Sequence, residues 1–251
     1  MKPEDITYDM PEPGSTEQKA MSTKPFRQVM GIVLYAVGIC RMDLAFTAAF
    51  LSRFMHNPSQ HHWNCVLNLL GYIKAHPDEG ITFGKNKDKR EKNLLQIYSD
   101  SNFAQDTIDR SSISGFALIF AGAAFGVKSK KQSTTATSTA EAEYIALFAA
   151  VLEAIYYRYL LEFVGLKQNF PTSIYEDNTA AINIANNQVA HSRTKSWDIK
   201  YHRIRQALKD QDVNISYVPS EKNLADPFTK PLVGSIFAKV FTWLFGRLFG
   251  Q

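Results

Sequence analysis

The hydrophobic period of this chain changes at a charged stretch that runs from Lys85 to Lys92. Before this stretch, over residues 26–76, apolar side chains recur at three- and four-residue steps, which predicts helices. After it, the apolar residues form short runs of strand length that alternate with longer helical patterns. Such an order is typical of a mixed α/β sheet with helices packed on it.

Five segments follow from this change of period. Residues 1–25, where prolines lie among polar residues, predict an irregular lead-in. Residues 26–84 predict a small helical segment, and residues 85–93 a charged linker. Residues 94–232 predict the α/β domain. Residues 233–251 carry apolar side chains at helical steps and predict an amphipathic helix.

Within the α/β domain, the order of the predicted elements defines the sheet. They are a strand at 94–98, a hairpin at 115–127, a helix at 140–164, a strand at 174–176, helices at 178–186 and 198–210, and a strand at 215–218. Ala121-Gly122 is the predicted turn of the hairpin. The sheet therefore has five predicted strands.

The amphipathic helix at 233–251 has two interpretations. It could lie on a membrane surface or pack on a protein. We expect it to dock on this domain or on a larger partner, because it directly follows the α/β domain and nothing else in the sequence suggests a membrane. No apolar run reaches the ~18 residues of a membrane span. No membrane partner is expected.

Composition adds weak constraints. The net charge of +4 is compatible with a polyanionic partner. Cys40 and Cys65 are the only cysteines, too few for a disulfide framework in a chain of 251 residues, which indicates a reducing compartment.

Four acids lie at the ends of predicted strands or in the first turns of predicted helices. They are Asp100, Glu143, Asp177 and Asp226. Any one of them alone is more simply a helix cap or an exposed charge. Carboxylates that converge repel one another unless a cation lies among them, and oxygen ligands favour magnesium or manganese. Together, the four predict a divalent metal site.

The choice of glutamate stays open at this point. Glu141 and Glu143 lie two residues apart and point to nearly opposite sides of the predicted helix. The apolar arc that follows is too wide to choose between them. Glu176, the strand neighbour of Asp177, is expected to face the other side of the sheet.

Several motifs follow one another in a continuous order. They include Tyr98-Ser99-Asp100-Ser101, Ser138-Thr139-Ala140-Glu141-Ala142-Glu143-Tyr144, Asp177-Asn178, His191-Ser192-Arg193-Thr194-Lys195 and Ala225-Asp226-Pro227-Phe228-Thr229-Lys230. Over residues 94–232 the chain thereby resembles the ribonuclease H domain of copia-type LTR-retrotransposon Pol polyproteins. Residues 26–84 resemble the thumb or connection end of the reverse transcriptase upstream. The Tyr-x-Asp-Asp motif of the polymerase is absent, so a C-terminal piece of Pol is expected.

This resemblance implies a ribonuclease H-like fold, a mixed five-stranded sheet flanked by helices. It implies endonucleolytic hydrolysis of the RNA strand of RNA–DNA hybrids during reverse transcription. Asp100, Glu143, Asp177 and Asp226 would bind two Mg²⁺ ions, with Mn²⁺ as an alternative, and the family pattern favours Glu143 over Glu141. The implied partners are the hybrid and the rest of the reverse transcriptase, in a cytoplasmic virus-like particle or in the nucleus.

Nucleic-acid contacts are predicted from basic clusters and from polar residues near the acids. The cationic candidates are Lys128, Lys130, Lys131, Arg193, Lys195 and Arg203, which suit phosphate contacts. For any single lysine, a solvated surface is the simpler interpretation. Ser101 and Asn178 could hydrogen-bond the 2′-hydroxyls that distinguish RNA from DNA.

Two other functions share this fold. One is an inactive Pol remnant that binds hybrid nucleic acid or packs against the polymerase, although the presence of all four acids argues against decay of the site. The other is a DNA-cutting relative, which ranks last because such sites usually have three carboxylates at other spacings.

Overall fold

The computed structural model describes residues 7–84, 93–106, 110–187, 198–232 and 234–246. The predicted linker at 85–93 therefore lies outside the described residues, apart from Asn93. The same holds for Arg193 and Lys195, two of the predicted phosphate contacts.

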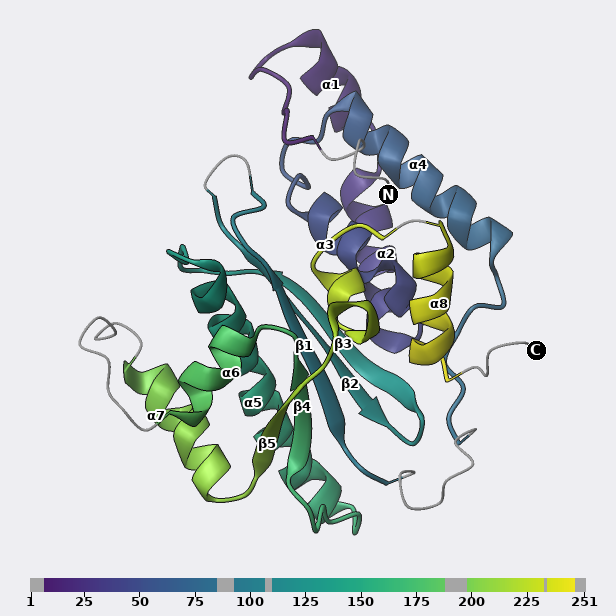
Figure 1. The fold of residues 1–251 in the computed structure, drawn as a ribbon. Coiled ribbons are helices and arrows are strands. Elements are labelled where there is room, and N and C mark those ends of the chain that lie inside the picture. Colours follow the sequence, from purple (N-terminus) through teal and green to yellow (C-terminus); the bar gives the residue numbers. More distant parts are fainter. Residues whose placement is uncertain (1–6, 85–92, 107–109, 188–197, 233, 247–251) are drawn as a thin grey trace.

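Five strands form one mixed sheet (Figure 1). They are β1 (Gln96–Asn102), β2 (Ile113–Phe120), β3 (Ala123–Lys131), β4 (Thr172–Glu176) and β5 (Val213–Tyr217). Across the sheet the order is β3-β2-β1-β4-β5. The first three strands pair antiparallel, whereas β4 runs parallel to β1 and β5 parallel to β4. The predicted mixed five-stranded sheet is confirmed.

The turn between β2 and β3 is the predicted one. Phe120 pairs with Ala123, which leaves Ala121 and Gly122 as a two-residue loop. Both have positive φ, 52° and 82°, as a type I′ turn requires. This backbone twist matches the right-handed twist of the two strands, so the hairpin closes tightly.

One face of the sheet is covered by three helices. They are α5 (Thr139–Phe163), α6 (Thr179–Asn186) and α7 (Asp198–Lys209). Leu147 and Val151 of α5 are fully buried against Ile97 of β1 and Ile174 of β4, in the largest core of the molecule. By length and composition α5 could also cross a membrane. Its buried side, however, forms the centre of this core.

The opposite face of β1, β2 and β3 is covered by α8 (Gly234–Leu244) and the short helix η5 (Asp226–Phe228). Leu244 and Phe228 are buried here together with Ala117 of β2. Met42, from the N-terminal part of the chain, belongs to the same cluster. The predicted C-terminal helix therefore docks on this domain.

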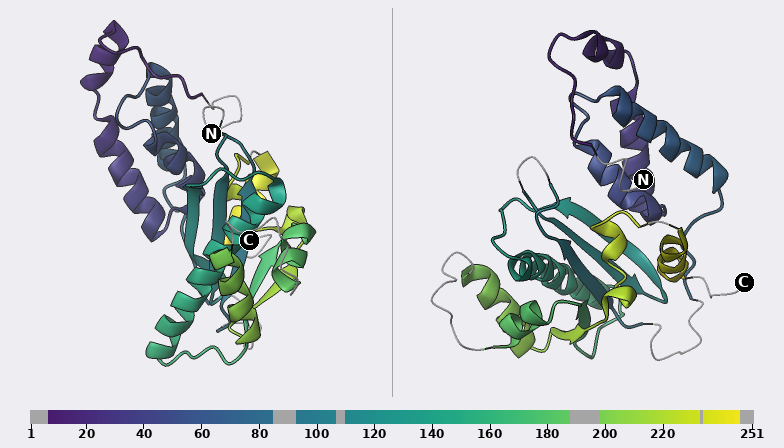
Figure 2. Two further views of the ribbon diagram at one scale, coloured as in Figure 1. Left: turned by 90° about the vertical axis from the view of Figure 1, so that its left-hand side faces the viewer. Right: turned by 45° about the horizontal axis from the view of Figure 1, so that its top comes forward.

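The N-terminal helices lie together at one side of the sheet, next to α8 (Figure 2). They are α1 (Thr16–Ser22), α2 (Phe26–Ile39), η2 (Met42–Leu44), α3 (Ala45–Ser52) and α4 (Gln60–Ala75). Helix α1 lies within the predicted irregular lead-in and begins at an N-cap, because the Ser15 hydroxyl accepts from the amide of Gln18. The irregular structure predicted for residues 1–25 is therefore wrong for residues 16–22.

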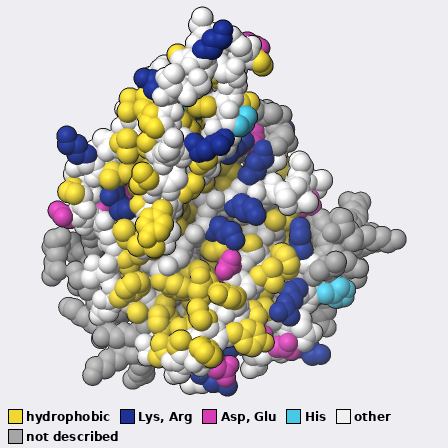
Figure 3. Space-filling model, turned by 180° about the vertical axis from the view of Figure 1, so that it is seen from behind, with side chains coloured by type: hydrophobic (Ala, Val, Ile, Leu, Met, Phe, Trp, Pro, Cys, Tyr) yellow, Lys and Arg dark blue, Asp and Glu magenta, His cyan; other side chains and the backbone are white. Residues whose placement is uncertain are grey.

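Part of the surface of α2 is apolar and exposed. Ile32, Tyr35 and Ile39 are 70%, 73% and 61% exposed. The view from behind in Figure 3 shows hydrophobic side chains gathered in two areas of one face. Large apolar patches on a protein surface usually mark contacts with another protein.

A buried ion cluster joins the N-terminal helices to the sheet. Asp106, 1% exposed, follows β1 and pairs with Arg53 at the end of α3. Lys131 at the end of β3 lies 2.7 Å from the same carboxylate. The Arg53 guanidinium also lies over the Tyr8 ring, 5.0 Å from its centroid. Two cations from two parts of the fold thus share one buried acid.

We predict that Asp106→Ala destabilises the protein by about 3 kcal/mol, because it leaves two partly buried cations without their shared anion. Urea unfolding would measure this change. The matched control is Glu153→Ala, which removes the exposed ion pair with Lys128 at 3.3 Å and should cost less than about 1 kcal/mol. Equal losses in the two variants would show that the cluster does not hold the two parts together.

Candidate metal centre

The parallel strands β1 and β4 bring two predicted acids to the same end of the sheet, where the carboxyl ends of both strands lie. Their register pairs Tyr98 with Tyr175, whose rings stack with centroids 4.7 Å apart. Asp100 and Asp177 each follow two residues later, so they project from the same face as these tyrosines. The two neighbouring strands therefore place these carboxylates next to each other.

Glu143 joins them from the first turns of α5. One carboxylate oxygen each from Asp100, Glu143 and Asp177 lie within 4.8 Å of one another. Asp100 and Glu143 are each 4% exposed, and Asp177 is half-buried. Three of the four predicted acids thus converge on one point.

Glu141 has a different role in the same helix. Its carboxylate accepts from the backbone amide of Thr137 at 2.6 Å and from the Thr137 hydroxyl. Its own amide donates to the hydroxyl of the N-cap residue Ser138 at 3.2 Å. Glu141 therefore caps the helix, which leaves Glu143 as the glutamate that faces Asp100 and Asp177.

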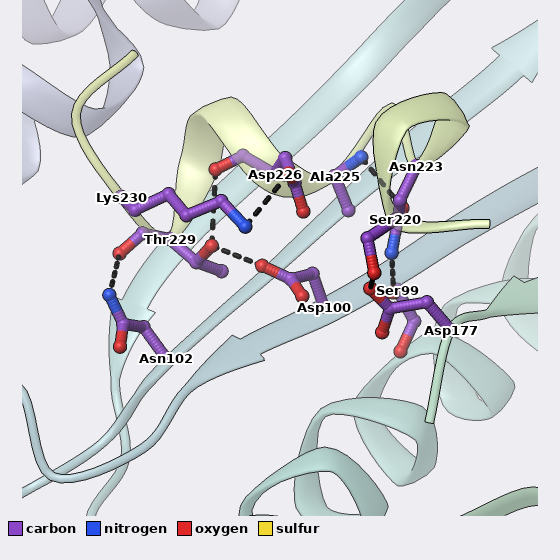
Figure 4. Close-up of polar contacts among 10 residues, drawn as sticks. All are labelled: Ser99, Asp100, Asn102, Asp177, Ser220, Asn223, Ala225, Asp226, Thr229 and Lys230. Carbon is purple, nitrogen blue, oxygen red and sulfur yellow. Dashed lines mark hydrogen bonds and ion pairs between the residues drawn. The ribbon is translucent and has the colours of Figure 1, made fainter. Parts of the chain in front are cut away.

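The fourth acid, Asp226, begins η5 and is held by residues that follow it (Figure 4). The Lys230 ammonium lies 2.8 Å from Oδ2 of Asp226. The Thr229 hydroxyl donates to Oδ2 of Asp100 and lies 3.1 Å from the carbonyl oxygen of Asp226. The turn from Asp226 to Lys230 is thereby fastened to Asp100.

Gly115 lets this turn lie directly on the sheet. In β2 it pairs with Asp100 of β1. A Cβ at this position would lie 2.7 Å from Cγ2 of Thr229 and 3.0 Å from Cβ of Phe228. No side chain fits there without displacing η5, so glycine is needed for the close approach.

Burial and mutual repulsion raise the proton affinity of these acids. Burial, and next the charge of Asp226, raise the pKa of Asp100 to about 7. Burial also raises the pKa of Glu143, and the charge of Glu176 adds to this effect. Burial raises the pKa of Asp226, against which the Lys230 ammonium acts. Because these acids resist ionisation, a cation bound among them would strongly stabilise their charged forms.

Glu176 lies on the α5 side of the sheet, as expected from the strand alternation, but that side also holds Glu143. It is fully buried and accepts from the Ser99 hydroxyl at 2.9 Å. Burial raises the pKa of Glu176 as well. Glu176 therefore lies next to the three converging acids, and its charge acts on Glu143.

The donor set fits a divalent cation with oxygen ligands. Among the described residues, Oε2 of Glu143 and Oδ1 of Asp226 are buried without a hydrogen-bond partner. Buried carboxylate oxygens without donors are costly unless a cation binds them. All four candidate ligands are carboxylates, which suits Mg²⁺ or Mn²⁺ better than zinc.

The predicted nucleic-acid contacts divide into two groups. Lys130 and Arg203 are exposed. Ser101, in contrast, is buried beside Glu143, so its hydroxyl is not open to the predicted 2′-hydroxyl contact. Lys128 is exposed but pairs with Glu153, and Lys131 lies on the opposite face and is held by Asp106. The three lysines therefore do not form one basic cluster.

Asn178 is also committed within the fold. Its Oδ1 accepts from the amides of Ala180 and Ala181 and caps α6. A 2′-hydroxyl that donated to Oδ1 would compete with this cap. The predicted RNA contact of Asn178 is thus restricted to donation by its side-chain nitrogen, Nδ2.

Four residues of the site were not predicted as functional. Thr229 and Lys230 could have been recognised, because they follow Asp226 by three and four residues and so return to it within one turn. The Ser220 hydroxyl donates to Oδ2 of Asp177 at 2.6 Å, and Asn223 donates to the carbonyl of Ser99 at 2.8 Å. Both come from the loop before Asp226, and no sequence pattern marks them.

Comparison with known proteins identifies relatives among transposon polyproteins. No protein-family model matches the chain. The retrovirus-related Pol polyprotein from transposon TNT 1-94 of Nicotiana tabacum is 33% identical over 219 residues, which are 87% of this chain and 16% of that polyprotein. That from transposon RE2 of Arabidopsis thaliana is 33% identical over 82% of this chain and 14% of the polyprotein. The chain thus spans only a small part of these relatives.

Three other similarities are shorter. The secreted RxLR effector protein 161 of Plasmopara viticola is 32% identical over 54% of this chain and 93% of that protein. Among solved structures, a ribonuclease H1 in complex with an RNA/DNA hybrid superimposes with a TM-score of 0.40 and 17% identity, over 53% of this chain and 92% of that one. The ribonuclease H1 of Halobacterium salinarum gives a TM-score of 0.41 at 19% identity, over 54% of this chain and 93% of that one.

We predict that Gly115→Ala displaces the turn that carries Asp226 and weakens metal binding, with little loss of the sheet itself. The rise in melting temperature on addition of Mg²⁺ would shrink to less than half of the wild-type rise. The control is Gly126→Ala, whose new Cβ would meet only the end of the flexible Leu118 side chain, at 3.0 Å. An unchanged Mg²⁺ effect in Gly115→Ala would contradict the close-approach argument.

The raised pKa of Asp100 gives a second prediction. Its folded pKa of about 7 lies above the ordinary value of 3.8, so the stability it contributes is complete below pH 4 and is lost as the pH rises through 7. Without metal, the melting temperature should fall between pH 5 and pH 8, less so in Asp100→Asn. Mg²⁺ should stabilise the wild type more at pH 8 than at pH 5. Identical pH profiles of the metal-free wild type and Asp100→Asn would contradict the shift.

Proposed function

The chain belongs to the retrovirus-related Pol polyproteins of copia-type transposons, and on this premise we propose that it is their ribonuclease H. It would cleave the RNA strand of RNA–DNA hybrids endonucleolytically, with two Mg²⁺ ions. The observation that carries this proposal is the convergence of Asp100, Glu143 and Asp177 within 4.8 Å, with Asp226 fastened to Asp100 by its own turn.

The arrangement of the acids suits this reaction. Two divalent ions held by these carboxylates would supply an activated water and would stabilise the leaving 3′ oxygen, so no dedicated protein base would be needed. Asp100 is close to both groups of acids: one of its oxygens lies within 4.8 Å of Glu143 and Asp177 oxygens, and its Oδ2 accepts from Thr229 in the turn that bears Asp226. It is therefore the carboxylate best placed to be shared between two ions. Asp226 on one side and Glu143 with Asp177 on the other would complete the two ligand sets.

A row of polar side chains runs from the acids to the exposed edge of the sheet. Ser101 of β1 pairs with Ser114 of β2, which pairs with Lys130 of β3, so the three side chains form a row on one face. Ser101 begins this row at Glu143, and Lys130 ends it as an exposed cation at the sheet edge. We propose that the hybrid approaches the acids from the exposed end of this row, with Lys130 on a phosphate.

The second proposed partner is the remainder of the longer polyprotein. The exposed face of α2 supports this, because Ile32, Tyr35 and Ile39 form an apolar surface on a helix whose other side is buried in the N-terminal core. Such a surface suits packing against another folded domain. Figure 3 shows the face on which apolar side chains gather.

We predict that the full chain cleaves a labelled RNA–DNA hybrid in Mg²⁺, and that Asp100→Asn and Glu143→Gln each lower the rate by about 100-fold or more, because each removes a ligand of the ions. EDTA should abolish cleavage. RNA–RNA and DNA–DNA duplexes serve as substrate controls and should stay intact.

The matched control is Glu141→Gln, two residues from Glu143 in the same helix, which should keep cleavage near the wild-type rate because Glu141 only caps α5. Wild type that binds the hybrid but does not cleave it would overturn the proposal and favour an inactive remnant. Loss of activity in Glu141→Gln with full activity in Glu143→Gln would exchange their roles.

A further inference from the structure

We propose that Glu176 is a positioning residue: its buried carboxylate connects the two strand ends that carry Asp100 and Asp177 and fixes the distance between these ligands. The inference rests on the proposed metal site. It adds a residue that does not touch the metal or the substrate, but acts through the acids beside it.

The need for such a connection comes from the sheet. The backbone pairing of β1 with β4 ends at Tyr98 and Tyr175. Asp100 and Asp177 lie two residues beyond this last pair, where no ladder between these strands holds them. Two carboxylates that repel each other therefore lie where β1 and β4 no longer pair with each other, although β2 still pairs with Asp100.

Glu176 closes this gap with its side chain. Oε2 accepts from the hydroxyl of Ser99, the residue before Asp100, at 2.9 Å. Oε1 accepts from the backbone amide of Asn178, the residue after Asp177, at 3.2 Å. Ser99 and Glu176 are both fully buried. One carboxylate thus bonds the chain neighbours of both ligands.

The same connection extends to the fourth acid. The carbonyl of Ser99 accepts from Nδ2 of Asn223 at 2.8 Å (Figure 4). Oδ1 of Asn223 accepts from the amide of Ala225 at 3.0 Å, directly before Asp226. Asn223 is 1% exposed. Ser99 is therefore the point at which the segments bearing Asp100, Asp177 and Asp226 are joined.

The chemistry of these bonds separates three roles for Glu176. Glutamine has the same shape and can keep both bonds, since its oxygen accepts from Asn178 and its amide donates to Ser99, whose hydroxyl turns to accept. Leucine fills a similar volume but accepts no hydrogen bond. A metal ligand would tolerate neither change, a space-filling residue would tolerate both, and a positioning residue tolerates only glutamine.

The test measures Mg²⁺ binding and cleavage for full-length Glu176→Gln, Glu176→Leu and Asp177→Asn. The Mg²⁺-induced rise in melting temperature, titrated against Mg²⁺ concentration, reports metal affinity without any turnover. We expect Glu176→Leu to raise the half-saturating Mg²⁺ concentration by about 10-fold or more, as changes next to metal ligands do. Glu176→Gln should stay within about 3-fold of the wild type.

Asp177→Asn marks the loss of a ligand. If Glu176→Gln weakens Mg²⁺ binding as much as Asp177→Asn does, Glu176 is itself a ligand and the inference is wrong. If Glu176→Leu binds Mg²⁺ like the wild type, Glu176 only fills space and the inference is also wrong. Because the titration needs no cleavage, it gives its answer even if the wild type fails to cut the hybrid, which would refute the proposed function alone.

A double-mutant cycle with Ser99→Ala tests the partner. The increase in half-saturating Mg²⁺ concentration in Ser99→Ala combined with Glu176→Leu should be smaller than the product of the two single increases, because both changes break the same bond. Increases that multiply in full would show that Ser99 and Glu176 act independently, against the proposed connection.

Discussion

The repulsion among buried carboxylates is the constraint on which the rest of this structure depends. Asp100, Glu143 and Asp177 are held within 4.8 Å although burial and mutual charge oppose their ionisation. The surrounding contacts counter this repulsion in different ways. Thr229 donates to Asp100, Ser220 donates to Asp177, and Lys230 supplies a cation to Asp226. Asp100, Asp177 and Asp226 are thus each contacted by a donor or a cation, whereas Oε2 of Glu143 has no hydrogen-bond partner among the described residues. The charge that these contacts do not balance is left for a metal.

The fold and the core of the site could be predicted from the sequence because periodic patterns report strands, helices and the edge where parallel strands end. The order of strands from Leu94 to Val218 was sufficient for the mixed sheet. Asp100 and Asp177 follow strand patterns directly, so their meeting was predictable. Asp226 does not follow a strand pattern. Its position depends on Gly115, 111 residues earlier in the chain, because only glycine leaves room for the turn that carries Asp226.

Other parts of the site could not be obtained from local patterns. Periodicity alone did not separate Glu141 from Glu143, because the apolar arc of α5 is wide. The difference arises from Thr137, whose amide and hydroxyl both bind Glu141. Lys131 looked like a phosphate contact beside Lys130, but strand alternation places it toward Asp106. In both cases a partner from outside the motif decides the role of the residue.

The shared packing of α8, the sheet and the N-terminal helices has a consequence for any larger assembly. Met42 and Ala45 lie in one core with Phe228 and Leu244, and Arg53 is paired with Asp106. The N-terminal helical segment is therefore held in a fixed position on the sheet. A domain held by the outer face of α2 would therefore keep a constant distance and orientation relative to the carboxylates at the end of the sheet.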